Sequence, residues 1–106
     1  MVKKKLPVIW DDFAKQSLKE IYLYIKKDSP QSAIKVRNTI STLASSLSVF
    51  PERHQVEFLI DNKSYRSVPL WSYKIIYRVT EKEVRIVDIF HTSRNPEDLK
   101  KLTKFS

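Results

Sequence analysis

The chain has 106 residues, 42% of them hydrophobic and 30% charged, so we expect one globular domain spanning residues 1–106. Twenty Lys and Arg against twelve Asp and Glu give a formal net charge of +8, which is typical of proteins that bind a polyanion. An acidic protein partner or a merely solvated surface are the alternatives. The absence of cysteine excludes disulfides and thiolate metal sites, and the absence of glycine excludes P-loop and glycine-rich dinucleotide-binding motifs.

The first half of the chain is predicted to form a short strand and two helices. Residues 3–9 read as a strand, at an edge or a strand end because Pro7 has no N–H to donate. Helical spacing begins at Asp11, with the stripe Ala14, Leu18, Ile21 and Ile25. Ser29 and Pro30 are a helix-start signal, and a second stripe runs up to Pro51: Ala33, Val36, Ile40, Leu43, Ala44, Leu47 and Phe50. About three residues join the helices, of about seventeen and twenty-one residues by this pattern, so they should form an antiparallel hairpin.

The second half is predicted to be an antiparallel meander followed by a short helix. Strand-like runs cover residues 56–60, 65–70, 73–79 and 84–91, and Asn95 and Pro96 begin the last helix. The fold class is therefore α+β, with an N-terminal strand and a helix hairpin packed on one face of a mainly antiparallel sheet of three or four strands. Alternation in the third run places Tyr73, Ile75, Tyr77 and Val79 toward the helices and Lys74, Ile76 and Arg78 on an open face.

Residues 62–80 contain four cations and no acid. We expect three of them to contact phosphate or another target on the open sheet face: Arg66, Lys74 and Arg78. Aromatic rings that could stack on bases lie nearby: Tyr65, Trp71 and Tyr73. The alternative is that the tyrosines are core and the cations keep an exposed face soluble.

The sequence also offers one candidate catalytic corner. His91 ends the last strand and Arg94 follows three residues later, so with Lys74 and Arg78 they could supply the acid, base and cations of metal-free RNA cleavage. The competing interpretation is a hydrogen-bonding surface histidine. No His and carboxylate cluster has metal-ligand spacing, so we expect no metal and no cofactor. The helices carry ordinary core stripes, so we expect no membrane contact. With no cysteine and too few apolar residues near the start for a signal segment, we expect a cytoplasmic protein.

The order and spacing of these strings, from Leu6 to Pro96, resemble the bacterial RelE/ParE toxins. The resemblance rests on the helix hairpin and on the strand pair YKIIYRV and VRIVDIFHTSR, which is similar to the family's Y-[RK]-I-x-Y-x-V and H-x-x-R. It implies a small growth-inhibiting toxin of a plasmid-stabilisation type, encoded beside a cognate antitoxin that neutralises it. ParE-type members block DNA gyrase, whereas RelE-type members cut mRNA on the ribosome.

The resemblance also bears on the branch. Lys74 falls where RelE-type enzymes place a phosphate-contacting arginine, and Arg66 falls near one of their lysines. No tyrosine follows Tyr77, although RelE-type enzymes usually use one near the C-terminus, and the hairpin looks long as in ParE proteins. We therefore predict a ParE-like toxin, with His91 and Arg94 catalytic only if the protein is a RelE-type nuclease. A decayed, non-toxic member is a third hypothesis.

Overall fold

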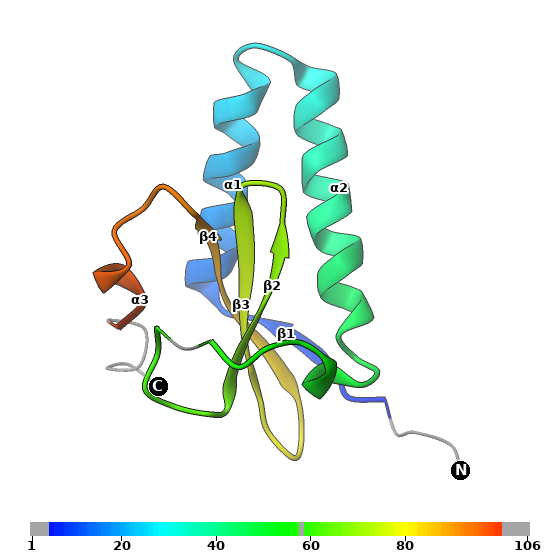
Figure 1. Ribbon diagram of the computed structural model, residues 1–106. Helices are drawn as coiled ribbons and strands as arrows, with labels where there is room; N and C mark the ends of the chain where they lie inside the picture. The colour runs from blue at the N-terminus through cyan, green and yellow to red at the C-terminus, as the bar shows by residue number, and fades with distance from the viewer. Residues whose placement is uncertain (1–4, 58, 101–106) are drawn as a thin grey trace.

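The computed structural model describes residues 5–57 and 59–100. In chain order the elements are β1 (Val8–Trp10), α1 (Asp12–Lys26), α2 (Pro30–Ser46), the 3₁₀ turn η1 (Pro51–Arg53), β2 (Tyr65–Leu70), β3 (Tyr73–Val79), β4 (Val84–His91) and α3 (Glu97–Lys100). The helix hairpin stands against one face of the sheet, and α3 lies beyond the end of β4 (Figure 1). No helix among the described residues is both long and apolar enough to cross a membrane.

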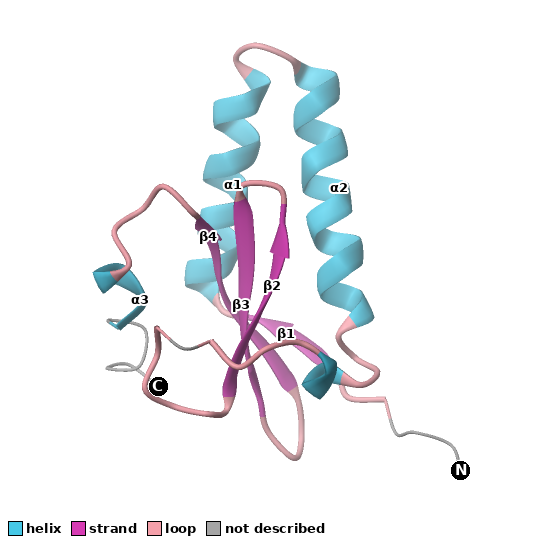
Figure 2. Cartoon of the chain, in the orientation of Figure 1, coloured by secondary structure: helices cyan, strands magenta, loops and turns pink. Residues whose placement is uncertain are grey.

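The sheet has four strands in the order β1-β4-β3-β2 (Figure 2). β1 runs parallel to β4, and the other neighbouring strands, β4 with β3 and β3 with β2, are antiparallel. The predicted α+β class and the three long strands are confirmed. Of the strand predicted over residues 3–9, the structure forms Val8–Trp10, while residues 3 and 4 lie outside the described residues.

The helices begin where predicted but are shorter than the pattern suggested. Ser29 caps α2 by accepting the Ser32 N–H at 3.2 Å, and Pro30 follows at the first helical position. α1 has 15 residues and α2 has 17, ending at Ser46. Pro51 disfavours helical backbone in the residue before it, and Phe50 adopts a left-handed conformation (φ 54°, ψ 54°). The last apolar residues of the predicted stripe, Leu47 and Phe50, therefore lie beyond the end of α2.

The core between the helices and the sheet follows the predicted alternation. Ile75 and Tyr77 are fully buried in this core, and Tyr73 and Val79 are partly buried at its edge. The Tyr77 hydroxyl donates to the Pro51 carbonyl at 2.5 Å, which ties β3 to η1. β4 contains one extra residue: the partner of Ile76 is Asp88, whereas the partner of Tyr77 is Ile86.

The prediction that the other face of the sheet is open was wrong. Ile76 is fully buried there, in a second cluster with Phe90, Leu99 and Ile60. Residues 55–57 and 59–64 lie over this face, and α3 packs Leu99 against it (Figure 1). Two short covers therefore bury apolar side chains that the sequence placed toward solvent.

The strand predicted over residues 56–60 was also wrong. Only Val56 pairs, in an isolated bridge with Arg66, and residue 58 lies outside the described residues. The Glu57 carboxylate accepts the Leu59 N–H at 3.0 Å, and the Ile60 N–H bonds back to the Glu57 carbonyl at 3.2 Å. These local bonds turn the backbone and compete with a strand ladder.

Candidate functional site

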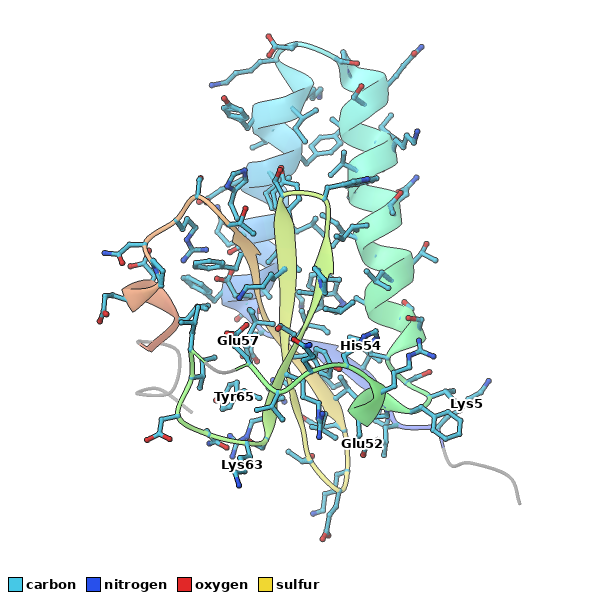
Figure 3. All side chains as sticks on the ribbon, viewed as in Figure 1. Lys5, Glu52, His54, Glu57, Lys63 and Tyr65 are labelled. Carbon is cyan, nitrogen blue, oxygen red and sulfur yellow. The ribbon has the colours of Figure 1, made fainter. Side chains whose placement is uncertain are left out.

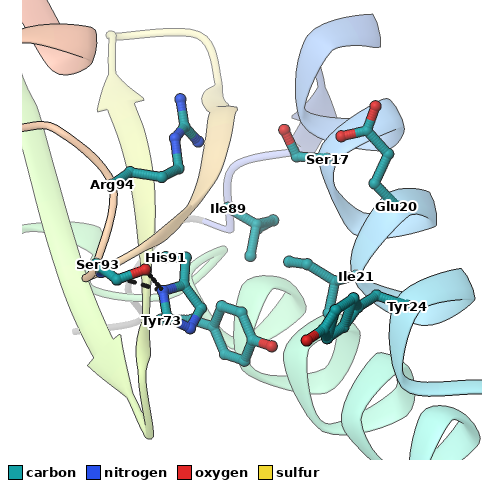
Figure 4. A pocket seen from close by; sticks show the side chains of 9 residues that line it. All are labelled: Ser17, Glu20, Ile21, Tyr24, Tyr73, Ile89, His91, Ser93 and Arg94. Carbon is teal, nitrogen blue, oxygen red and sulfur yellow. Dashed lines mark hydrogen bonds between the residues drawn. The ribbon is translucent and has the colours of Figure 1, made fainter. Parts of the chain in front are cut away.

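The candidate catalytic corner lines a cavity of about 420 Å³ between α1 and the end of β4 (Figure 4). His91 and Tyr73 face each other across β4 and β3, so strand alternation puts both on the helix side of the sheet. α1 contributes the opposite wall with Ser17, Glu20, Ile21 and Tyr24. The structure thus places His91 and Arg94 on one cavity.

His91 is held by contacts on both sides of its ring. Its plane meets the Tyr73 ring edge-on, with centroids 5.2 Å apart. The Ser93 N–H donates to Nδ1 at 3.0 Å, and the Ser93 hydroxyl lies 2.6 Å from the same nitrogen (Figure 4). Because a backbone amide can only donate, Nδ1 is the acceptor and the ring proton sits on Nε2. The one lone pair that a neutral histidine offers as a general base is therefore already occupied.

Arg94 is bound to the protein itself. Its Nη1 donates to Asp88 Oδ2 at 2.9 Å, its Nε lies 3.7 Å from Asp98, and its guanidinium lies 4.6 Å from the centroid of the Phe90 ring. Asp88 is completely buried, and its other oxygen accepts the Ser17 hydroxyl at 2.7 Å. A buried carboxylate requires such partners, so Arg94 neutralises Asp88 and connects the loop after β4 to α1.

Lys74 lies on the covered face of the sheet and makes an ion pair. Its ammonium donates to Glu57 Oε1 at 2.7 Å; the Glu57 side chain is 1% exposed and the Lys74 side chain 19%. Burial alone would raise the pKa of Glu57, but hydrogen bonds from Lys74, the Leu59 amide and Ser67 outweigh it and hold the pKa below its ordinary value. Glu57 is labelled in Figure 3, where it lies in front of the sheet.

The other two predicted target-binding residues differ in how they are engaged. Arg66 Nη1 donates to the carbonyls of Glu52 at 3.1 Å and His54 at 2.6 Å, and so holds the η1 segment. The Arg78 guanidinium lies 5.5 Å from the Tyr65 ring centroid, and its Nε is buried without a hydrogen-bond partner among the described residues. Tyr65 itself is fully buried, so its ring is closed to a stacking base.

The two predicted groups do not converge. Arg66, Lys74 and Arg78 are absent from the lining of the cavity that holds His91 and Arg94. For Lys74 the reason is strand alternation: it follows Tyr73 directly, so its side chain leaves the sheet on the opposite face. Arg66 is paired with Tyr77 and so lies on the helix side, where it was not predicted, but its guanidinium is directed to the η1 segment. Whether these cations contact a target stays a prediction.

Sequence reasoning missed Tyr24 as a cavity residue, whereas it named Trp71 as an aromatic ring that could stack on a base. Tyr24 is 69% exposed and lines the cavity from α1, and Trp71 is 58% exposed at the tip of the β2–β3 hairpin. Trp71 has φ 55°, a conformation that favours glycine. A signal was present for Tyr24, since it lies off the core stripe of the first helix.

The comparisons with known proteins agree with this architecture. A solved chain described as belonging to the chromosomal ParDE TA system from P. aeruginosa matches with a TM-score of 0.71 and 22% identity, covering 82% of this chain and 96% of that one. That likeness shows a shared fold. A family model for the ParE toxin of the type II toxin-antitoxin system, parDE, matches residues 8–96. The chain therefore belongs to the ParE toxin family. Comparison with curated protein sequences gave no match.

Proposed function

We propose that this ParE-family protein inhibits growth by binding and poisoning DNA gyrase in the cytoplasm, without chemistry of its own, and that a cognate antitoxin neutralises it. The observation that carries the proposal is the state of the candidate catalytic groups. Ser93 occupies the His91 acceptor nitrogen and Asp88 holds Arg94, while Lys74 is paired with Glu57 on the other face. RNA cleavage without a metal needs a base, an acid and cations around one phosphate, and these residues are committed elsewhere.

The exposed apolar side chains support binding as the mode of action. Five large ones among the described residues are between 47% and 69% exposed. Besides Phe50, three lie on α1 and one on the β2–β3 turn: Phe13, Leu23, Tyr24 and Trp71. Aromatic residues of this kind supply most of the affinity at protein interfaces. We propose that they serve as contacts for the antitoxin or for gyrase.

The alternative is a ribosome-dependent mRNA nuclease of the RelE type. One observation favours it: Tyr73 lines the same cavity as His91 and Arg94. Its hydroxyl group could transfer a proton in addition to the His91 ring. In this hypothesis a substrate phosphate would displace the Ser93 and Asp88 contacts.

Two assays on the purified protein separate these functions. Inhibition of DNA supercoiling by gyrase is expected at protein concentrations that leave an mRNA intact in a translating extract. His91→Ala is the matched variant, because loss of an acid-base group costs about 10²- to 10⁴-fold in rate. A gyrase inhibitor keeps its potency in this variant. Cleavage within translated codons by the wild type, lost in His91→Ala, would establish the nuclease instead, and normal growth on induction would contradict both toxin hypotheses.

A further inference from the structure

A basic groove runs along the outer side of the helix hairpin. We define it by four cations around one tyrosine: Lys15, Lys19, Lys26, Arg37 and Tyr22. On α1 these positions follow the spacing i, i+4, i+7 and i+11, which is the core stripe shifted by one residue toward α2. Arg37 comes from α2 and closes the groove from the other helix. A cavity of about 300 Å³ lies within it, with Trp10, Leu18 and Ser41 also in its lining.

Aromatic contacts position two cations of the basic groove. The Arg37 guanidinium lies 4.8 Å from the Tyr22 ring centroid and the Lys26 ammonium lies 5.7 Å from it. Such cation–π contacts orient a charge and leave it positive. The groove therefore presents two positioned cations beside a partly buried tyrosine ring.

Among the described residues, the cations of the basic groove have no close carboxylate partner, unlike three cations of the sheet and the loop after it. Lys74, Arg85 and Arg94 each have a carboxylate within 3 Å. Of the described acids, only Asp12 comes within 4.0 Å of a groove cation; it lies 4.0 Å from Lys15, with both side chains exposed. An exposed pair at that distance contributes almost nothing. None of the residues that line the cavity is acidic.

We propose that the basic groove binds the sugar-phosphate backbone of duplex DNA. Lys15 to Lys26 spans about 16 Å along the helix axis, a length over which one DNA strand presents about five phosphates. Binding to a phosphate backbone depends on several cations at the surface, which the groove supplies. The choice of DNA over another polyanion rests on the proposed function, because gyrase holds a DNA duplex that a bound toxin would meet.

Binding of a fluorescein-labelled 20-base-pair duplex, followed by anisotropy across a salt series, tests the groove without gyrase. The groove variant carries Lys15→Gln, Lys19→Gln and Arg37→Gln. The control carries Lys35→Gln, Lys63→Gln and Lys82→Gln, which remove the same charge from exposed positions outside the groove. Three lost phosphate contacts should reduce the slope of log K against log salt by about 2.7 and weaken binding about tenfold or more at 0.1 M salt. The control should keep the wild-type slope.

Three results would overturn the proposal: no DNA binding by the wild type, equal weakening in both variants, or tighter groove-dependent binding of a 20-residue polyglutamate than of DNA. Gyrase inhibition is measured separately, so the two proposals fail independently. A protein that inhibits supercoiling but does not bind DNA contradicts the groove alone. A protein that binds DNA through the groove but leaves gyrase active contradicts the gyrase target alone.

Discussion

Replacing Lys74 by alanine is expected to destabilise the protein by about 2–4 kcal/mol, because it leaves the Glu57 carboxylate buried without a counter-charge. Breaking a fully buried pair typically costs about 3–5 kcal/mol, and the 19% exposure of the Lys74 side chain lowers that range. The Leu59 N–H and Ser67 remain as partners of the carboxylate. For a chain of this size the loss corresponds to a fall in Tm of about 8–20 °C.

The pH dependence gives this prediction a second, independent readout. In the wild type the pKa of Glu57 is lowered in the fold, so the pair stabilises the protein at pH values above the unfolded pKa of 4.5. That contribution is lost as the pH falls through the folded pKa. In Lys74→Ala the hydrogen bond that lowers the Glu57 pKa most is absent, so it no longer outweighs the effect of burial on that pKa. The difference in free energy of unfolding between wild type and variant should therefore narrow below about pH 4.5.

Urea unfolding at pH 7 and at pH 3.5, followed by circular dichroism, measures both effects. Lys82→Ala removes an exposed lysine from the β3–β4 turn and should change stability by less than about 0.5 kcal/mol. The double variant Glu57→Gln with Lys74→Met should recover most of the loss, since it removes both charges and keeps the side-chain volumes. A Lys74→Ala protein as stable as Lys82→Ala would refute the reasoning, as would a difference from wild type that stays constant down to pH 3.5.

Three further predictions concern single contacts. Arg94→Ala should destabilise by about 2–3 kcal/mol by leaving Asp88 buried, and adding Asp88→Asn should restore part of this in a denaturant titration; no recovery would contradict the pairing. Trp71→Gly should be about 1 kcal/mol more stable than Trp71→Ala in thermal unfolding, because glycine tolerates positive φ, and equal stabilities would argue against backbone strain. Burial raises the pKa of Tyr77 to about 12, so the free energy of unfolding should fall between pH 10 and 12, where the tyrosine ionises in the unfolded chain but not in the folded one. Tyr77→Phe should lack the last step of an absorbance titration of the tyrosines. It should also be about 1 kcal/mol less stable, because it loses the hydrogen bond to the Pro51 carbonyl.

The elements of this fold could be predicted from local sequence because their signals are local. Ser29 and Pro30 mark the start of α2 through one cap and one missing donor, and alternation set the bounds of β2, β3 and β4. The face of β3 that meets the helices followed from the same alternation. Residues 56–60 were mistaken for a strand, since their composition suits one and the turning carboxylate bond of Glu57 has no counterpart in a pattern of apolar residues.

The candidate site could be predicted only in part. The sequence placed His91 and Arg94 at the end of β4, three residues apart, and the structure puts them on one cavity. It could not show that Ser93 occupies the His91 acceptor, which depends on the turn after β4. It missed Tyr24, whose role at the cavity depends on how α1 sits against the strand ends.

Sequence by itself determined the elements, the family resemblance and the total charge, since periodicity, caps and composition are read along the chain. Only the tertiary structure decided which charges remain uncompensated. Lys74 meets Glu57 across 17 positions and Asp88 meets Ser17 across 71, so no local pattern records these partners. The sheet cations that the sequence favoured are therefore largely engaged within the protein, while Lys15, Lys19 and Arg37 face one groove because two helices pack side by side.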